Sequence, residues 1–248
     1  MKIIKLSVLT LLFIMLSCSQ TEELESAMVN PDGSSSSSAY QYRDTDVAAE
    51  NLENPYDVAG FLNSELSLAY FNTPLRDTSQ SAVITDVVAL ANSTTAFQQL
   101  SPEAYFFSDV STLNHLLSVS DSDLVLTESI QFAILDMDLQ VSIEDFIHHI
   151  MEKCADDESY GSLYHEIVSY ESSILNNFLI NESDRRVVLV TTSLLRHQIK
   201  QKRKRPKKNT DRDWDYMITT MGATAVGTKI NLQNAIILSL LTEISLAH

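Results

Sequence analysis

Glycine and proline, the residues that mark the turns of strand-rich folds, are scarce in this sequence, with five of each among 248 residues. So few turn residues argue against a sandwich or barrel of many short strands. Leucine, serine and isoleucine are plentiful instead. The composition therefore predicts an all-α protein, organised as a single bundle of about six to eight helices.

Reaction motifs are also missing. The sequence contains no Gly-x-Ser-x-Gly, no glycine-rich phosphate loop, no His-Glu-x-x-His and no Cys-x-x-Cys, which are spacings typical of nucleophilic, phosphate-binding, zinc and redox sites. Asp136 with Asp138, and the acidic run 156–158, are carboxylate groupings expected by chance in a chain with 33 acidic residues. We therefore predict no catalytic residue and no cofactor.

Metal-ligand residue types occur, but their spacing is unfavourable. His148 and His149 are adjacent, so on a helix they point to different sides, and Cys154 faces the expected core. Helical ligands of one ion are instead typically four residues apart. His165 with Glu166 adds no convergent set, so we predict no metal site. His115 and His197 are interpreted as lone histidines, at the surface or partly buried.

Charge is distributed unevenly along the chain. Residues 19–184 contain 29 acidic side chains against three basic ones, whereas residues 185–248 contain 12 basic against four acidic ones. Such asymmetry marks either a partner surface or a basic C-terminal part that lies against an acidic remainder of the same fold. Both interpretations stay open at this point.

The N-terminus has the three parts of a secretory signal peptide over residues 1–17. Lys2 and Lys5 precede an apolar stretch of eleven residues, and Ser17 is a small residue at the expected cleavage site. A spanning helix needs about 20 apolar residues, so this stretch is too short to be one. Residues 15–18, Met-Leu-Ser-Cys, resemble a bacterial lipobox, which implies a lipid on Cys18 and membrane attachment through it. Cys154 would then have no disulfide partner, and we expect it to be a small buried hydrophobe.

Residues 18–48 are polar, include five consecutive serines and show no apolar period, so they predict a disordered tether. A flexible chain of about 30 residues spans on the order of 30 Å. Ser19 after the cysteine resembles the outer-membrane sorting context, and residues 19–23 resemble the acidic surface-export tract of Bacteroidota lipoproteins. We expect a lipid-anchored protein of the cell envelope at the outer membrane, with surface display as an open alternative.

The remaining residues, 49–248, are predicted to form the α-helical domain. The clearest signal is a stripe of apolar residues from Ile143 to Cys154, preceded by a near capping box at Ser142. Glu171 falls on the apolar seam of a later helix, and we expect it at the edge of that seam with its carboxylate in water. The expected helices cover residues 58–69, 82–99, a short segment from 101, 120–139, 142–154, 160–179, 181–199 and one last helix that starts near 211 or 213 and continues to 244.

The last of these helices contains small residues between Met221 and Gly227. Small residues four apart allow close helix packing. The apolar run from Ala235 to Leu241 is too short to span a membrane. We predict tight packing inside the bundle. The second hypothesis is a membrane-active, bacteriocin- or toxin-like effector that uses residues 214–246.

One basic run of seven residues lies between positions 200 and 208. Such a run is typical of nucleic-acid or nuclear-targeting patches, but an exported lipoprotein meets neither nucleus nor chromosome. Two interpretations stay open: a solvated loop, or a site for anionic lipid or surface polysaccharide. The candidate anionic-ligand residues are Lys200, Lys202, Arg203, Lys204, Arg205, Lys207 and Lys208.

Two stretches resemble a family of Bacteroidota (flavobacterial) lipoproteins of unknown activity. The first is Asn-Pro-Tyr-Asp-x-x-Gly at residues 54–60, followed by Leu62-Asn63 where the family has His-Asn. The second is Ser193-x-x-Arg196, with a later tryptophan, Trp214, and the Gly/Ala-rich last helix. The resemblance implies a secreted helical lipoprotein and brings no catalytic residues.

Physical roles follow for several residues of these two stretches. Residues 54–57 would start the first helix, and Gly60 would let another backbone come close. Arg196 would pair with an acid such as Asp213 or Asp215. Our leading functional hypothesis is a non-enzymatic, envelope-associated binding or interaction protein, with partner and oligomeric state open. A hydrolase assembled from residues distant in sequence is the third hypothesis.

Overall fold

The computed structural model describes residues 47–73, 77–101, 103–201 and 212–247. These residues form ten helices and no strand, which confirms the all-α prediction. The signal peptide, Cys18, most of the tether and six of the seven basic candidates, Lys202 to Lys208, lie outside the described residues. The helices are α1 (Val58–Phe71), α2 (Gln80–Ser93), α3 (Thr95–Gln98), α4 (Val110–Ser118), α5 (Ser122–Ala133), α6 (Met137–Ala155), α7 (Tyr160–Asn176), α8 (Glu182–Gln201), α9 (Arg212–Ile230) and α10 (Leu232–Ala247).

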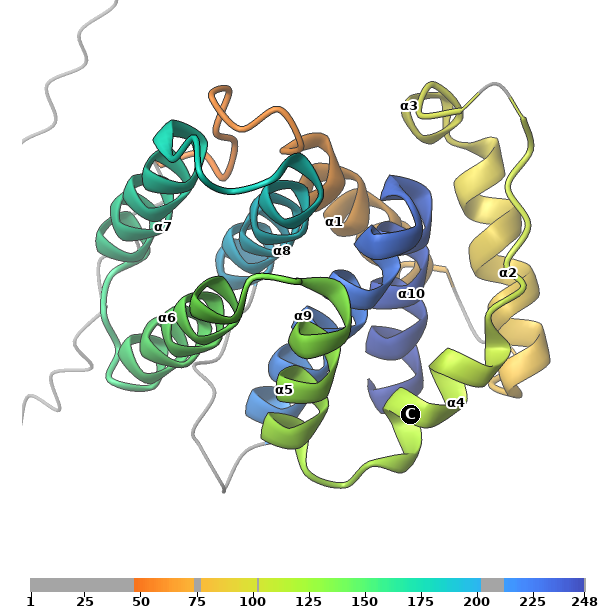
Figure 1. Cartoon of the computed structure of the whole chain (residues 1–248). Helices are drawn as coiled ribbons and strands as arrows, with labels where there is room; N and C mark the ends of the chain where they lie inside the picture. Colours follow the sequence, from red (N-terminus) through yellow and green to blue (C-terminus); the bar gives the residue numbers. More distant parts are fainter. Residues whose placement is uncertain (1–46, 74–76, 102, 202–211, 248) are drawn as a thin grey trace, which may run out of the picture. The chain divides into compact units, whose positions relative to one another are not determined.

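Helices α9 and α10 form the centre of the bundle (Figure 1). Helix α9 packs against α10, α5 and α8, and α10 also contacts α1 and α2. The predicted tight packing at the small residues is confirmed, because a Cβ on Gly227 would lie 2.6 Å from the Cα of Ala235. The expectation of one continuous last helix is wrong. Asn231 separates the two helices, and its side-chain oxygen accepts from the backbone N–H of Asn234 at 2.8 Å, which caps α10.

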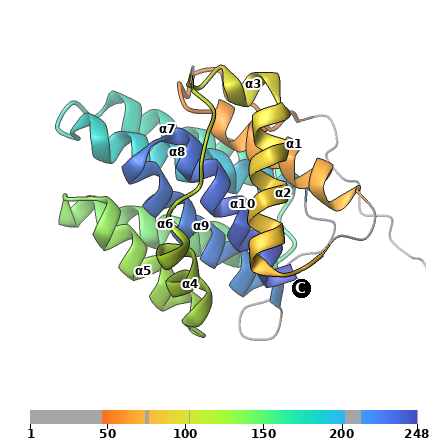
Figure 2. The ribbon, with the colours of Figure 1, turned by 90° about the vertical axis from the view of Figure 1, so that its right-hand side faces the viewer.

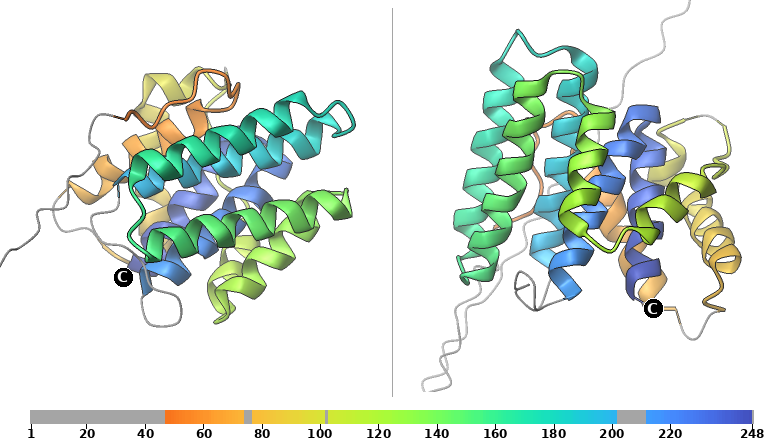
Figure 3. Two further views of the ribbon diagram at one scale, coloured as in Figure 1. Left: turned by 90° about the vertical axis from the view of Figure 1, so that its left-hand side faces the viewer. Right: turned by 60° about the horizontal axis from the view of Figure 1, so that its bottom comes forward.

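Helices α6, α7 and α8 form a second group, with α6 and α7 in front of α8 when the bundle is viewed from the left of Figure 1 (Figure 3, left panel). The predicted apolar stripe of α6 is confirmed: Ile143, Ile147, Ile150, Met151 and Cys154 are all buried. The predicted start of that helix at Ser142 is wrong. Asp136 caps α6 by accepting from the backbone N–H of Leu139 at 3.0 Å, which places Ser142 inside the helix.

The second predicted helix, over residues 82–99, is divided at Thr94, whose extended backbone separates α2 from α3. Figure 2 shows α2 upright in front of α1 and α10. The short helix predicted from Ser101 is not found in residues 103–109, the described part of that segment. The next helix, α4, begins at Val110 and is capped by Asp109, whose carboxylate accepts from the backbone N–H of Thr112 at 3.2 Å. Among the described residues, no helix is both long enough and apolar enough to cross a membrane.

Candidate functional site

The most polar part of the interior is centred on Arg196 of α8 and Glu171 of α7, both of which have no exposed surface. The Arg196 guanidinium donates from Nη1 to Glu171 Oε1 at 2.6 Å and from Nε to the carbonyl of Ala49 at 2.6 Å. Its Nη2 donates to the carboxylate of Asp57. Each guanidinium nitrogen therefore has an acceptor, as a buried cation requires.

Glu171 accepts hydrogen bonds from side chains that precede the first helix and from α8. Asn51 donates to Oε2 at 2.6 Å and Asn54 donates to Oε1 at 3.0 Å. Thr192 donates to Oε1 at 2.9 Å. Residues 47–57, which we call the leading segment, are thus bonded into the core by charged and amide groups rather than by apolar packing alone.

Asp57, at the end of the leading segment, completes this buried network. Burial by itself raises the pKa of the Asp57 carboxyl, but the neighbouring His197 ring and the Arg196 guanidinium outweigh it, so the pKa lies below its usual value of 3.8. Ser193 donates to Asp57 Oδ1 at 3.1 Å and accepts from the N–H of Gly60 at 3.2 Å. A Cβ at Gly60 would lie 2.6 Å from the backbone carbonyl oxygen of Ser193, so the predicted close approach of another backbone at this glycine is confirmed.

Two predictions about this network are wrong. Glu171 does not lie at the edge of its seam with its carboxylate in water, because four donors satisfy it inside the protein. Arg196 pairs with Glu171 and Asp57 rather than with Asp213 or Asp215, and Asp215 instead accepts from Ser122 at 2.8 Å. A signal was available in the sequence: a carboxylate on an apolar seam and an arginine on the most apolar helix each need a partner of opposite charge.

The adjacent histidines of α6 point to different helices, as predicted. His148 Nε2 lies 3.1 Å from Asp123 of α5, and His149 Nε2 lies 2.7 Å from Glu166 of α7. His165 is exposed and lies edge-on to Tyr164, not toward Glu171. No group of three or more His, Cys, Asp or Glu side chains suited to a metal ion occurs in the described part of the chain.

Lys200 is the one candidate of the basic run that the described ranges include. Its ammonium donates to the carbonyl of Val47 and lies 5.1 Å from the centre of the Tyr160 ring. The start of the basic run is therefore beside the point at which the described chain begins. Arg212, where α9 begins, donates to the carbonyl of Leu246 at 2.7 Å.

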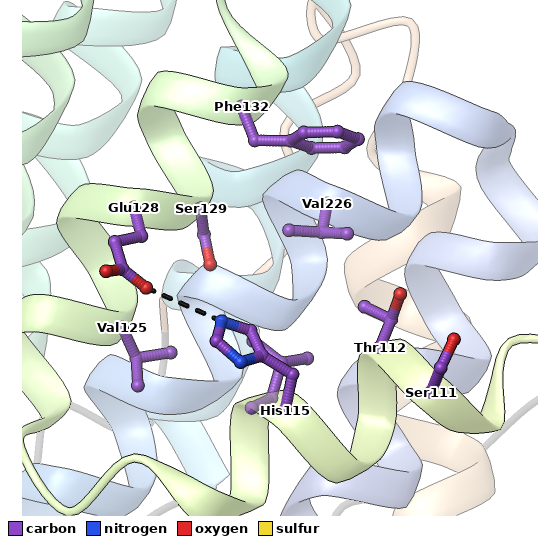
Figure 4. A pocket seen from close by; sticks show the side chains of 9 residues that line it. Ser111, Thr112, His115, Val125, Glu128, Ser129, Phe132 and Val226 are labelled. Atoms are coloured by element: carbon purple, nitrogen blue, oxygen red, sulfur yellow. Dashed lines mark ion pairs between the residues drawn. The ribbon is translucent and has the colours of Figure 1, made fainter.

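A groove of about 340 Å³ opens between α4 and α5 (Figure 4). His115 and Glu128 face each other across it at 3.5 Å, with 64% and 48% of their side chains exposed. Water screens an ion pair this exposed, so it contributes little. Phe132 and Val226 supply apolar surface. The groove offers a place for an apolar group, and it holds no convergent set of acid, base and nucleophile.

The titratable groups that do converge are Asp57, Glu171, Arg196 and His197, whose Nε2 lies 3.6 Å from Asp57 Oδ1. All four are buried or nearly so, the first three pair with one another, and the four form no open reaction centre. Ser193 lies beside them, but its hydroxyl donates to Asp57 and is not directed at a histidine. Asp57, Glu171 and Arg196 therefore form a structural link that joins the leading segment to α7 and α8, and we call these three residues the clasp. Comparison of the chain with protein-family models, with curated proteins and with solved structures finds no match.

Proposed function

We propose that this protein is an exported lipoprotein of the cell envelope, anchored through lipid on Cys18, that binds a partner and performs no chemistry. In this proposal the end of the bundle at which α8 terminates faces the membrane. The basic residues from Lys200 to Lys208 bind anionic lipid headgroups there. The partial motifs at residues 54–60 and 193–196 support membership of the flavobacterial lipoprotein family.

The contact between Lys200 and Val47 is the observation that carries the proposal. Val47 lies at the end of the predicted tether, so this contact supports a basic run that starts beside the junction of tether and domain. The predicted tether has about 30 residues, and a flexible chain of that length reaches on the order of 30 Å. A lipid at Cys18 would therefore keep this end of the bundle within reach of the bilayer.

Charge supports the same orientation. Each Lys or Arg beside an anionic bilayer contributes about 1 kcal/mol, and stable attachment generally combines lipid with a second signal such as a basic patch. Residues 19–184 carry 29 acidic side chains against three basic ones, so the rest of the chain is repelled by the same surface. Attraction at one end and repulsion elsewhere favour a single orientation.

The clasp supports binding over catalysis. Arg196 and Glu171 have no exposed surface, and their charged atoms are paired within the protein. A lipid-anchored domain also needs its leading segment fixed to the bundle, and two bonds from Arg196, to the carbonyl of Ala49 and the carboxylate of Asp57, provide that attachment.

The anchor is tested by labelled palmitate in cells. We expect label in the wild-type chain and none in Cys18→Ala. If the label enters both equally, the anchor is wrong and a freely secreted protein replaces it.

Binding of anionic lipid by the basic run is tested with the purified mature chain and vesicles that contain anionic lipid. Arg203→Gln removes one charge from the basic run, and Arg186→Gln, near the opposite end of α8, is the matched control. We expect weaker and less salt-sensitive binding for Arg203→Gln only. Equal binding by both variants contradicts the proposal. Binding to an acidic polysaccharide but not to vesicles replaces the lipid with a glycan partner.

A further inference from the structure

The groove between α4 and α5 has one polar group deep in its lining, the hydroxyl of Ser129. Ser129 belongs to α5, and only 4% of its surface is exposed. Figure 4 shows its oxygen directed into the groove, with Phe132 on one side and His115 on the other. Three buried apolar side chains complete the inner wall: Leu116, Val125 and Val226.

The Ser129 hydroxyl differs from the other buried hydroxyls of the bundle because it has no partner. A hydroxyl inside a helix commonly donates to the carbonyl one turn earlier, as Thr220, Thr224 and Thr242 do at 2.7 to 2.8 Å. For Ser129 that acceptor would be the carbonyl of Val125. Within the described ranges, no hydrogen bond joins the Ser129 hydroxyl to this carbonyl or to any other group. A nearly buried hydroxyl without a partner is costly, and a ligand that bonds to it removes that cost.

Gly222 of α9 fixes the place of this hydroxyl. A Cβ on Gly222 would lie 3.0 Å from Ser129 Oγ and 3.3 Å from a methyl group of Val125. The glycine therefore lets α5 lie close to α9 and leaves Ser129 Oγ against the α9 backbone, at the floor of the groove. Val226, one turn later on α9, also lines the groove. The floor is thus a contact between two helices, which holds the hydroxyl in one position.

Charge limits what can reach the floor. None of the described residues that line the groove is Lys or Arg. The two titratable side chains, His115 and Glu128, are 64% and 48% exposed, which places them at the mouth. A charged group at the floor would be removed from water with only a neutral hydroxyl beside it, which is unfavourable. An uncharged hydroxyl of a ligand can instead accept from Ser129 or donate to it.

The volume limits the size of the ligand. The groove measures about 340 Å³, which is within the range usual for small-molecule sites. A closed apolar cavity of about 150 Å³ is enough to hold benzene. One six-membered ring with its substituents therefore fits along the apolar wall. Phe132 is 60% exposed, so much of its ring is available for a second ring to pack against.

We propose that this groove binds a small uncharged molecule that consists of one apolar ring and one hydroxyl group. The hydroxyl bonds to Ser129 Oγ, and the ring lies against Val125, Val226 and Phe132. His115 and Glu128 stay at the mouth in contact with solvent. Membrane attachment through the basic run does not involve this groove, so binding of the ligand and binding of vesicles can fail separately.

The test uses the mature chain, with binding followed by NMR through the backbone amides of α4 and α5. The probes are phenol and toluene, which have nearly the same shape and differ by a hydroxyl in place of a methyl group. Benzoate is the anionic control. We expect phenol to shift the resonances of the groove residues at concentrations at which benzoate does not. Benzoate binding as tight as that of phenol, or no shift at these residues with phenol, overturns the proposal.

Ser129→Ala is the decisive variant, because toluene is more apolar than phenol and only a change in the ratio of their affinities reports the hydrogen bond. We expect the affinity for phenol to fall about 5-fold, as for the loss of one hydrogen bond, and the affinity for toluene not to fall. Ser81→Ala removes an exposed hydroxyl from α2, outside the groove, and should change neither affinity. If Ser129→Ala lowers both affinities by the same factor, or neither, the hydroxyl does not bind the ligand and the proposal is wrong.

Stability provides a separate check on Ser129→Ala. The hydroxyl has no partner within the described residues, so its removal should leave the urea midpoint at least as high as that of the wild type. The variant therefore remains folded for the binding measurement. A clear loss of stability would show that the hydroxyl is bonded inside the protein, and it would overturn the proposal.

Discussion

Helix α7 carries two carboxylates that each bond a cation on a neighbouring helix at the same distance. Glu171 lies 2.6 Å from Arg196 of α8, and Glu166 lies 2.6 Å from Lys153 of α6. The first pair has no exposed side-chain surface, whereas the side chains of the second are 31% and 35% exposed. The two pairs therefore have the same N–O distance but differ in their exposure to water and in the number of other groups bonded to them.

The difference shows which contacts determine the fold. Water competes for both members of an exposed pair, and side-chain entropy opposes the pairing, so such pairs contribute little. In the interior no water replaces a lost partner, and the removal of one charge leaves the other unsatisfied. The buried pair also links the leading segment, α7 and α8, because Asp57 and Asn51 bond to it. We expect substitutions in the two pairs to have very different effects.

Arg196→Met should cause the largest loss of stability. It leaves Glu171 buried without its cation and removes the bonds to Asp57 and Ala49, for which we expect a cost of about 3 to 5 kcal/mol. Urea unfolding followed by circular dichroism measures it. Combination with Glu171→Gln, which keeps the acceptor oxygen without the charge, should cost less than the sum of the two single changes. Additive losses would show that the two charges are not coupled.

The residues of the clasp separate what could be predicted from the sequence from what could not. Apolar periodicity correctly predicts the buried stripe of α6, and the predicted close approach at Gly60 is made by Ser193. The partner of Arg196 was missed because Glu171 and Asp57 lie 25 and 139 residues from it in the sequence. Periodicity reports which face of a helix is buried, but it contains no information about which other helix covers that face.

The ends of several helices were predicted wrongly for a different reason. Thr94 and Asn231 each interrupt a stretch whose apolar pattern continues on both sides, so no composition change marks the break. Phe178 continues the seam of α7 in the sequence, yet the helix ends at Asn176 and the side chain is 91% exposed. A single residue with extended backbone is enough to end a helix, and its local signal is weak. The groove between α4 and α5, which is lined by residues of several helices, had no signal in the sequence.

The pH dependence of the stability of Asp57→Asn tests how much the negative charge of Asp57 contributes to the clasp. The folded-state pKa of Asp57 is lowered, so its ionisation stabilises the fold at pH values above the usual 3.8, and this contribution is lost as pH falls through the lower folded value. At pH 7 we expect the variant to be less stable by about 2 kcal/mol. The difference from the wild type should narrow below about pH 4. Urea unfolding at pH 7, 5 and 3 measures it, and a constant difference would assign the effect to packing.

Glu166→Gln should have the smallest effect, although its N–O distance to Lys153 equals that between Glu171 and Arg196. The hydrogen bond from Lys153 lowers the pKa of Glu166, as does the nearby His149, but the side chain is 31% exposed and water screens both interactions. The amide of the variant can still accept from Lys153. We expect a urea midpoint that agrees with the wild type within experimental error at pH 7, in low and in high salt. A loss comparable to that of Arg196→Met would mean that α6 and α7 depend on this surface pair, and the contrast between buried and exposed charge on α7 would be wrong.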